Sequence, residues 1–266
     1  MRLGSMSNAI NGGTIDDIVA EAQRAKEGGF HTFWSSQIFG HDALTALAIV
    51  GREVPGIELG TAVVPTYPRH PWVMAQQSLT TVAAINSRGS GGLCLGIGLS
   101  HKIVVESMWG LSYEKPVRHL REYLSVLMPL LEGQPVQHRG EEYNVQGALA
   151  APGSSRPSVV VAALGPQMLR ITGAMADGTS TWCVGPKTLS ELTIPTLRQA
   201  AADAGRPDPR VVCALPIAVT DDVDGARKKA AQIFAVYDTL PSYKTMMNRE
   251  GVDGPGGLAI VGTEAE

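Results

Sequence analysis

The chain has 266 residues, of which 44% are hydrophobic and 18% charged, and its net charge is −3. This length allows a large buried core in one α/β barrel or two smaller domains, and no linker favours two. The scattered basic residues argue against a nucleic-acid partner or a membrane surface. Because the first residues lack the apolar core of a signal peptide and no apolar run reaches the roughly 18 residues of a membrane span, we expect a cytoplasmic protein.

Short apolar runs alternate with helical patterns along the chain. The expected strands are residues 2–6, 32–35, 57–64, 92–99, 158–164, 178–183, 210–219 and 258–262. The expected helices run from Thr14 to Gly28, over 42–48, from Pro71 to Ile85, from Val117 to Gly133, from Pro166 through Thr172, and over 189–204 and 224–237. Residues 134–157 form an excursion from this alternation, with a hairpin around Arg139-Gly140.

This alternation predicts a TIM-like (β/α)8 barrel in which residues 1–266 form a single domain. Residues 258–262 are the candidate eighth strand, and the C-terminal strand and helix of a complete barrel are expected to be missing or truncated.

The cysteines and histidines indicate neither disulfides nor a metal site. Cys94, Cys183 and Cys213 lie in apolar strand-like runs without CxxC spacing, so we expect buried, reduced thiols. The 6 histidines show no HxxxH or HExxH spacing, and no carboxylate cluster accompanies them. We therefore expect no metal.

Two predicted strands, 57–64 and 92–99, carry small residues near their ends, Thr61-Ala62 and Gly96-Ile97-Gly98. Small side chains let a flat ligand approach the backbone, so these strand ends are our candidate floor of an active site. Gly96-Ile97-Gly98 is not a dinucleotide fingerprint, because the third glycine and the acidic residue are absent. From the residues alone, ligand contact and close packing of strand on helix are equally open.

Three further positions are suited to ligand chemistry, each with a plain alternative. His101 follows the glycine-rich strand, where it can transfer a proton near neutral pH or simply face solvent. Trp182 ends another strand and can cover a ring-shaped cofactor or pack in the core. The third position is a strand-to-helix turn, which attracts phosphate through backbone N–H groups or is an ordinary tight turn. That turn consists of Ala163, Leu164, Gly165, Pro166 and Gln167.

In order and spacing, several motifs resemble the luciferase-like monooxygenase superfamily, and within it the coenzyme F420-dependent oxidoreductases common in actinobacteria. The resemblance covers nearly the whole chain. The motifs are Trp34-Ser35-Ser36-Gln37-Ile38-Phe39-Gly40, Leu59-Gly60-Thr61-Ala62-Val63-Val64-Pro65 with Arg69-His70-Pro71 and Ala75-Gln76-Gln77, Leu95-Gly96-Ile97-Gly98-Leu99-Ser100-His101, and Ala163-Leu164-Gly165-Pro166-Gln167-Met168-Leu169 with Ala176-Asp177-Gly178.

The resemblance implies a cofactor ring at the C-terminal face of a TIM-like barrel, backed by a non-proline cis peptide at Ala62-Val63. The implied cofactor contacts are Ser36, Gln37, Ala62, Val63, Gly98, Leu99, Ser100, Ala163, Trp182 and, for the phosphate, Leu164, Gly165, Pro166 and Gln167. Where many relatives carry an aspartate and a histidine at the tip of the second strand, this chain has Ser36-Gln37, a departure that affects the expected ring contacts.

The activity expected from this resemblance is hydride transfer between reduced deazaflavin and a small organic substrate, with His101 as the proton donor. The alternatives are an FMN-dependent monooxygenase that uses reduced flavin and oxygen, and a barrel that binds a cofactor without turnover. The family resemblance also implies a homodimer. The sequence does not identify the substrate.

Overall fold

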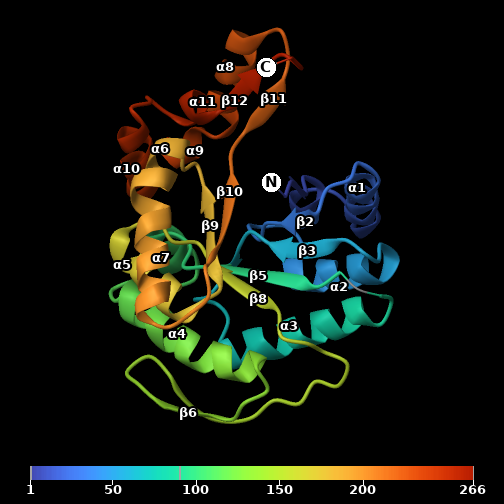
Figure 1. The fold of residues 1–266 in the computed structure, drawn as a ribbon, viewed down its shortest axis with the longest axis vertical. Coiled ribbons are helices and arrows are strands. Elements are labelled where there is room, and N and C mark those ends of the chain that lie inside the picture. The colour runs from blue at the N-terminus through green and yellow to red at the C-terminus, as the bar shows by residue number, and fades with distance from the viewer. Residues whose placement is uncertain (1, 90, 266) are drawn as a thin grey trace. The chain divides into compact units, whose positions relative to one another are not determined.

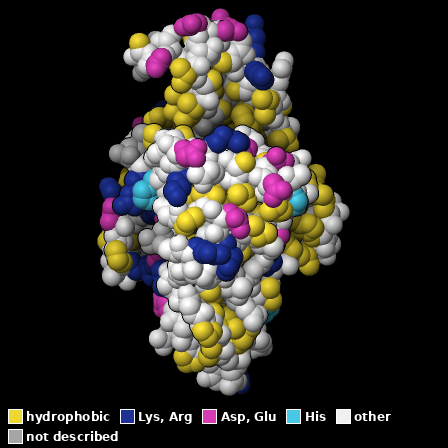
Figure 2. Space-filling model, turned by 90° about the vertical axis from the view of Figure 1, so that its right-hand side faces the viewer, with side chains coloured by type: hydrophobic (Ala, Val, Ile, Leu, Met, Phe, Trp, Pro, Cys, Tyr) yellow, Lys and Arg dark blue, Asp and Glu magenta, His cyan; other side chains and the backbone are white. Residues whose placement is uncertain are grey.

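The structure is a computed structural model that describes residues 2–89 and 91–265. It falls into two compact units (Figure 1). Unit 1 consists of Met1–Ala162 with Met175–Asp177, and unit 2 of Ala163–Ala174 with Gly178–Glu266. On the face drawn in Figure 2, acidic and basic side chains are interspersed with apolar ones. Within the described ranges, no helix has the length and apolarity needed to cross a membrane.

Unit 1 is built on a parallel sheet with the strand order β1-β2-β3-β5-β8. These strands are β1 (Gly4–Met6), β2 (Thr32–Ser35), β3 (Glu58–Thr61), β5 (Leu93–Gly98) and β8 (Ser158–Val161). A short strand, β4 (Val64–Pro65), continues the pairing with β5 after β3 has ended. The side chains of β2 and β5 are buried along their whole length, as their apolar runs predict. Because all these pairs are parallel, the carboxyl ends of the strands lie at one edge of the sheet.

Four helices pack against one another in chain order beside this sheet (Figure 1). They are α1 (Ile15–Glu27), α2 (Ala43–Glu53), α3 (Pro71–Asn86) and α4 (Pro116–Leu131). Helix α1 starts with the predicted cap, since the Thr14 hydroxyl accepts the Asp17 N–H and the Asp17 carboxylate accepts the Thr14 N–H. Asp42 caps α2 in the same position, and α3 begins at Pro71 as expected. Two short turns, η1 (Ala9–Asn11) and the π-helical η2 (Val104–Met108), follow β1 and β5.

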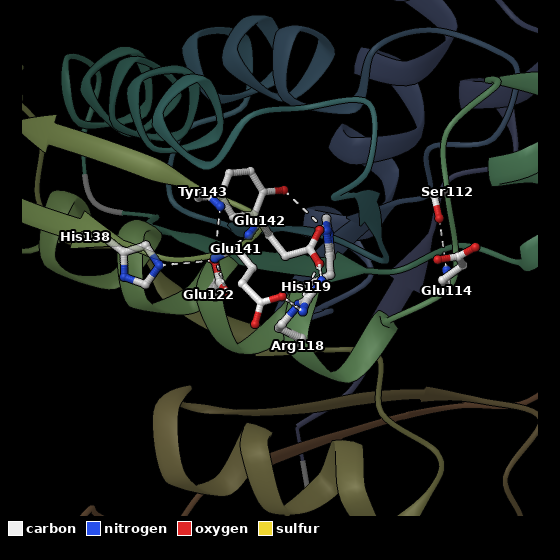
Figure 3. Close-up of polar contacts among 9 residues, drawn as sticks. All are labelled: Ser112, Glu114, Arg118, His119, Glu122, His138, Glu141, Glu142 and Tyr143. Atoms are coloured by element: carbon white, nitrogen blue, oxygen red, sulfur yellow. Dashed lines mark hydrogen bonds and ion pairs between the residues drawn. The ribbon is translucent and has the colours of Figure 1, made fainter.

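The predicted hairpin is confirmed. Strands β6 (Val136–Arg139) and β7 (Asn144–Gly147) pair in antiparallel fashion. The Glu122 carboxylate of α4 holds their connection, because it accepts the N–H groups of Glu141, Glu142 and Tyr143 at 3.0, 2.9 and 3.0 Å (Figure 3). These bonds hold the pKa of Glu122 below its usual value, although burial opposes them.

Unit 2 contains the parallel pair of β9 (Gly178–Trp182) and β10 (Arg210–Ala214). Its helices are α5 (Pro166–Met175), α6 (Pro186–Thr188), the π-helical η3 (Leu189–Thr193), α7 (Ile194–Asp203), α8 (Val223–Ile233), α9 (Ala235–Asp238), α10 (Pro241–Glu250) and α11 (Pro255–Leu258). The helices expected over 189–204 and 224–237 are thus each divided, the first into η3 and α7 and the second into α8 and α9.

The expected strand 210–219 and the candidate eighth strand require correction. The first is divided into β10 and β11 (Ile217–Val219), because Pro216 has no N–H to extend a ladder. The second shortens to β12 (Ile260–Gly262), which pairs in parallel with β11 in a separate sheet of 2 strands. The Pro216 carbonyl accepts the Ile260 N–H at 2.9 Å and begins this pairing. The assignment of 258–262 to the barrel sheet was therefore wrong.

Candidate active site

The ends of β2 and β3 are joined in unit 1 by one backbone hydrogen bond. The Ala62 N–H donates to the Ser35 carbonyl at 2.8 Å. The peptide bond between Ala62 and Val63 is cis, as the family resemblance implies. Both side chains are partly exposed at this edge of the sheet. The Ser35 hydroxyl is buried and has no hydrogen-bond partner among the described residues.

Where β3 separates from β5, hydrogen bonds from the Thr61 side chain take the place of backbone hydrogen bonds between the two strands. The ladder between these strands ends at Gly60 and Cys94. Beyond it, the Thr61 hydroxyl donates to the Gly96 carbonyl and accepts the Gly96 N–H, both at 2.8 Å. The side chain is completely buried. Sequence reasoning missed this role, because an apolar run gives no sign that a threonine within it will bridge two strands.

The glycines of β5 make room for the segment around the cis peptide. A Cβ atom on Gly96 would overlap the Thr61 carbonyl oxygen, and one on Gly98 would lie 2.6 Å from Val63 Cγ2. Gly98 also accepts the Thr66 N–H at 2.9 Å. Both glycines are therefore required for packing against the neighbouring strand segment rather than against a helix. Contact of Gly98 with a ligand stays a prediction.

Ser36 and Gln37, the predicted cofactor contacts that follow β2, both form hydrogen bonds within unit 1. The Ser36 hydroxyl accepts a bond from Asn11 Nδ2 at 3.3 Å. Gln37 Oε1 accepts the Ala43 N–H at 3.1 Å and thereby satisfies one donor at the start of α2. Sequence reasoning did not anticipate this helix-capping role. Whether these side chains also face a ring stays a prediction.

His101 lies three residues beyond the end of β5. Its carbonyl accepts the N–H groups of Val104 and Val105, both at 2.9 Å, and so begins the helical turn. Burial lowers the pKa of the His101 side chain, which favours the neutral imidazole near pH 7. The preceding residues are Leu99, which is buried, and Ser100, which has a left-handed φ of 61°. The Ser100 carbonyl accepts the Tyr113 hydroxyl at 3.4 Å.

A buried histidine, His119 of α4, supports the segment that follows β4. Its ring stacks on Tyr67 with centroids 3.9 Å apart and an interplanar angle of 3°. Its Nε2 lies 2.9 Å from Thr66 Oγ1. Its Nδ1 lies 3.4 Å from the Tyr143 hydroxyl (Figure 3). Burial lowers the pKa of His119 to about 4, so the ring is neutral at pH 7. The cluster joins three segments that are distant in sequence, and no sequence motif predicted it.

In unit 2, the candidate phosphate turn has open space beside its backbone. A Cβ atom on Gly165 would meet nothing within 4 Å, and the first turn of α5 carries no acidic side chain. The Gly165 carbonyl accepts the Leu169 N–H at 3.0 Å. This open space is compatible with a phosphate group, and phosphate binding by Leu164, Gly165, Pro166 and Gln167 stays a prediction. Ala163 is buried in a core cluster with Leu169 and Leu197.

Trp182 packs within an aromatic group of unit 2. Its ring makes edge contacts with Phe234 and Tyr237 at centroid distances of 5.1 and 5.7 Å. This is the core packing that sequence reasoning kept as the alternative. The buried Trp182 Nε1 has no partner among the residues described, and its role as a cofactor wall stays a prediction.

The structure confirms the cysteine prediction in part. Within the described part of the chain none of the three cysteines is in a disulfide; Cys94 and Cys183 are buried, and Cys213 is exposed. The prediction of burial was wrong for Cys213, which lies on β10. Among residues 2–89 and 91–265, no group of three or more His, Cys, Asp or Glu side chains is arranged to hold a metal ion.

Parallel strands that alternate with helices and pair in the sequential order β1-β2-β3-β5-β8 match the TIM-like class of α/β proteins. A family model described as luciferase-like monooxygenase matches residues 1–258. The chain therefore belongs to this family of oxidoreductases.

Among relatives, a 5,10-methylenetetrahydromethanopterin reductase from Methanolobus tindarius is 27% identical over 243 residues, which cover 91% of this chain and 72% of the relative. Two solved structures share the fold. A coenzyme F420-dependent tetrahydromethanopterin reductase from Methanopyrus kandleri has a TM-score of 0.78 and 22% identity, with 95% of this chain and 76% of that chain covered. An F420-dependent secondary alcohol dehydrogenase in complex with an F420-acetone adduct has a TM-score of 0.79 and 18% identity, with 99% and 86% covered.

Proposed function

We propose that this protein is a coenzyme F420-dependent oxidoreductase that transfers a hydride between the reduced deazaflavin and a small organic substrate. The observation that carries this proposal is that two fold neighbours are both F420-dependent enzymes. Their similarity covers 95% and 99% of this chain. The family match over residues 1–258 supports the redox class.

The residues at the strand ends fit such a cofactor within each unit. In unit 1, the backbone at Ala62-Val63 would support the ring, with further contacts from Ser36, Gln37, Gly98, Leu99 and Ser100. In unit 2, the turn at Gly165 would hold a phosphate, as the open space beside Gly165 and the absence of an acidic first turn permit. When bound, the reduced deazaflavin supplies the hydride at its C5 atom.

His101 is the proposed proton donor for the substrate. Because burial lowers its pKa, the imidazolium form becomes scarce as pH rises from below 6.5 to neutrality. In the reductive direction, kcat/KM should therefore fall with rising pH across this range. The opposite direction needs the neutral ring and should show the inverse profile.

Titration of the purified protein with F420 and with FMN, side by side, tests the cofactor. Saturable binding of F420 with weaker binding of FMN supports the proposal, whereas tight FMN binding without F420 binding replaces it with a flavin monooxygenase. Binding of F420 without turnover of any enone, ketone or imine would indicate a non-catalytic barrel.

Two variants test the proton donor. His101→Ala should lower kcat by about 10²-fold or more while F420 still binds. His31→Ala is the matched control, because His31 precedes β2 at the opposite edge of the sheet and its side chain is 41% exposed. Equal rates for parent and His101→Ala would remove His101 from the mechanism.

The assembly and compartment are also proposals. We propose a cytoplasmic homodimer, which light scattering tests through a mass twice the 28.1 kDa of the chain. A monomeric mass would contradict the dimer.

A further inference from the structure

Three aromatic rings stack in series within unit 1. The His119 ring lies 3.9 Å from the Tyr67 ring with an interplanar angle of 3°, and the Tyr67 ring lies 5.3 Å from the Tyr113 ring at 30°. These three residues form the ring stack. At its far end, the Tyr113 hydroxyl donates to the Ser100 carbonyl at 3.4 Å. The ring stack thus connects His119 of α4 with the residue that precedes His101 in the chain.

A second path of contacts leaves the same histidine. Thr66 Oγ1 lies 2.9 Å from His119 Nε2, and the Thr66 N–H donates to the Gly98 carbonyl at 2.9 Å. Thr66 is completely buried and directly follows β4. Because Gly98 is the last residue of β5, this path ends two residues before Ser100.

Hydrogen bonds on both ring nitrogens hold His119 in one orientation. Its side chain is buried, and its Nδ1 lies 3.4 Å from the hydroxyl of Tyr143, whose N–H donates to the Glu122 carboxylate (Figure 3). A neutral imidazole has one donor and one acceptor nitrogen, so one of the two hydroxyls beside it donates and the other accepts. Both bonds oppose rotation of the ring, which keeps its face against Tyr67.

The two paths converge on residues 98–100, at the end of β5. Ser100 has a left-handed φ of 61°, which is uncommon for a residue other than glycine and needs support from its surroundings. The bond from Tyr113 holds the Ser100 carbonyl, and the bond from Thr66 holds the Gly98 carbonyl. Together they fix the direction in which the backbone leaves β5, and with it the place where the His101 side chain begins.

We propose that His119 is a positioning residue for the candidate active site. Through Thr66 it holds Gly98, and through the ring stack it holds Ser100 and thereby orients His101. The inference rests on the proposed function, because that function makes Gly98 and Ser100 cofactor contacts and His101 the proton donor. His119 acts through these two paths and not by contact with cofactor or substrate.

NMR spectra of the histidine side chains, recorded without cofactor, test the positioning independently of turnover. His101→Ala identifies the His101 signals among those of the 6 histidines. Tyr113→Phe removes only the hydroxyl that bonds to Ser100 and keeps the ring, so it should shift the His101 signals. Thr66→Val removes the bond to His119 and should shift the signals of both histidines. Thr66→Ser keeps the hydroxyl and should retain the parent's signals.

Tyr123→Phe is the matched control, because it removes the same atom as Tyr113→Phe but outside both paths. The Tyr123 ring lies 5.7 Å from the His119 ring, and its buried hydroxyl has no hydrogen-bond partner among the described residues. This variant should leave the His101 signals within error of the parent. The inference is overturned if Tyr113→Phe and Thr66→Val also leave them there, or if Tyr123→Phe shifts them as much as Tyr113→Phe does.

A titration of the same samples with F420 separates the two paths. Thr66→Val should weaken F420 binding by about fivefold or more, because its path ends at a predicted cofactor contact, and Thr66→Ser should restore the parent's affinity. Tyr123→Phe should change the affinity less than about twofold. Equal affinities for parent and Thr66→Val would remove the path through Gly98 from the inference.

The two measurements also separate this inference from the proposed function. A parent that binds no F420, while its His101 signals respond to Tyr113→Phe and Thr66→Val, refutes the proposed cofactor and supports the positioning by His119. A parent that binds F420, while its His101 signals respond to neither variant, refutes the positioning alone.

Discussion

Replacing Thr61 by valine removes the hydroxyl that bridges β3 and β5 and keeps the shape of the side chain. Successive residues of β5 bond to opposite neighbours: the Ile97 carbonyl accepts the Ala162 N–H, and the Gly98 carbonyl accepts the Thr66 N–H. Gly96 therefore faces β3, where Thr61 Oγ1 partners both its N–H and its carbonyl at 2.8 Å. The substitution leaves both backbone groups buried and unpaired.

An unpaired buried polar group costs about 1–3 kcal/mol. Thr61→Val should therefore lower the free energy of unfolding by about 2–5 kcal/mol. Thr61→Ser keeps the hydroxyl and loses one methyl group, so it should cost only about 1 kcal/mol. Thr80→Val is a second control, because the exposed Thr80 hydroxyl bonds only within α3, to the Gln76 carbonyl at 2.8 Å. It should change stability by less than about 0.5 kcal/mol.

Urea denaturation followed by tryptophan fluorescence and far-UV circular dichroism measures these differences. Trp34, which is buried at the end of β2, reports on unit 1. The reasoning is refuted if Thr61→Val lies within about 0.5 kcal/mol of the parent, or if Thr61→Ser is as destabilised as Thr61→Val.

Other consequences follow from the same contacts. His119 has a folded-state pKa of about 4 against an ordinary value of 6.5, so its contribution to stability is complete above pH 6.5 and is lost as pH falls towards 4. The stability advantage of the parent over His119→Gln should shrink by about 3 kcal/mol between pH 7.5 and 4 in urea titrations, and equal pH dependence in both proteins would contradict this assignment. Gly165→Ala should change the free energy of unfolding by less than about 0.5 kcal/mol, because the added Cβ meets nothing within 4 Å. The same variant should weaken F420 binding, and unchanged binding would exclude the turn as the phosphate site. Gly98→Ala should lower the free energy of unfolding by about 1–3 kcal/mol, because its Cβ would lie 2.6 Å from Val63 Cγ2. An unchanged free energy of unfolding would contradict the close packing of Gly98 against Val63.

Local patterns predicted the elements whose residues carry their own signals. Thr14 with Asp17, Pro71, and the apolar run of β5 correctly placed two helix starts and a buried strand. The break at Pro216 was missed, although a proline inside a strand pattern is a signal that the ladder is interrupted. The partner of β12 was not predictable, because an apolar run of three residues does not specify which strand it joins.

The candidate site was predictable at the level of strand ends and less so at the level of side chains. The cis peptide at Ala62-Val63 came from the family resemblance and not from a physical signal in the residues. Contact of Gln37 with a ring stays a prediction, and its role in accepting the Ala43 N–H at the start of α2 was not anticipated. The His119 cluster escaped notice because its members are far apart in sequence and meet only through the tertiary fold.

The most direct test of the account is a binding titration of the purified protein with F420 and FMN under identical conditions. The account predicts saturable binding of F420, weaker binding of FMN, and a loss of F420 affinity in Gly165→Ala. Tight binding of FMN together with no detectable binding of F420 would contradict it.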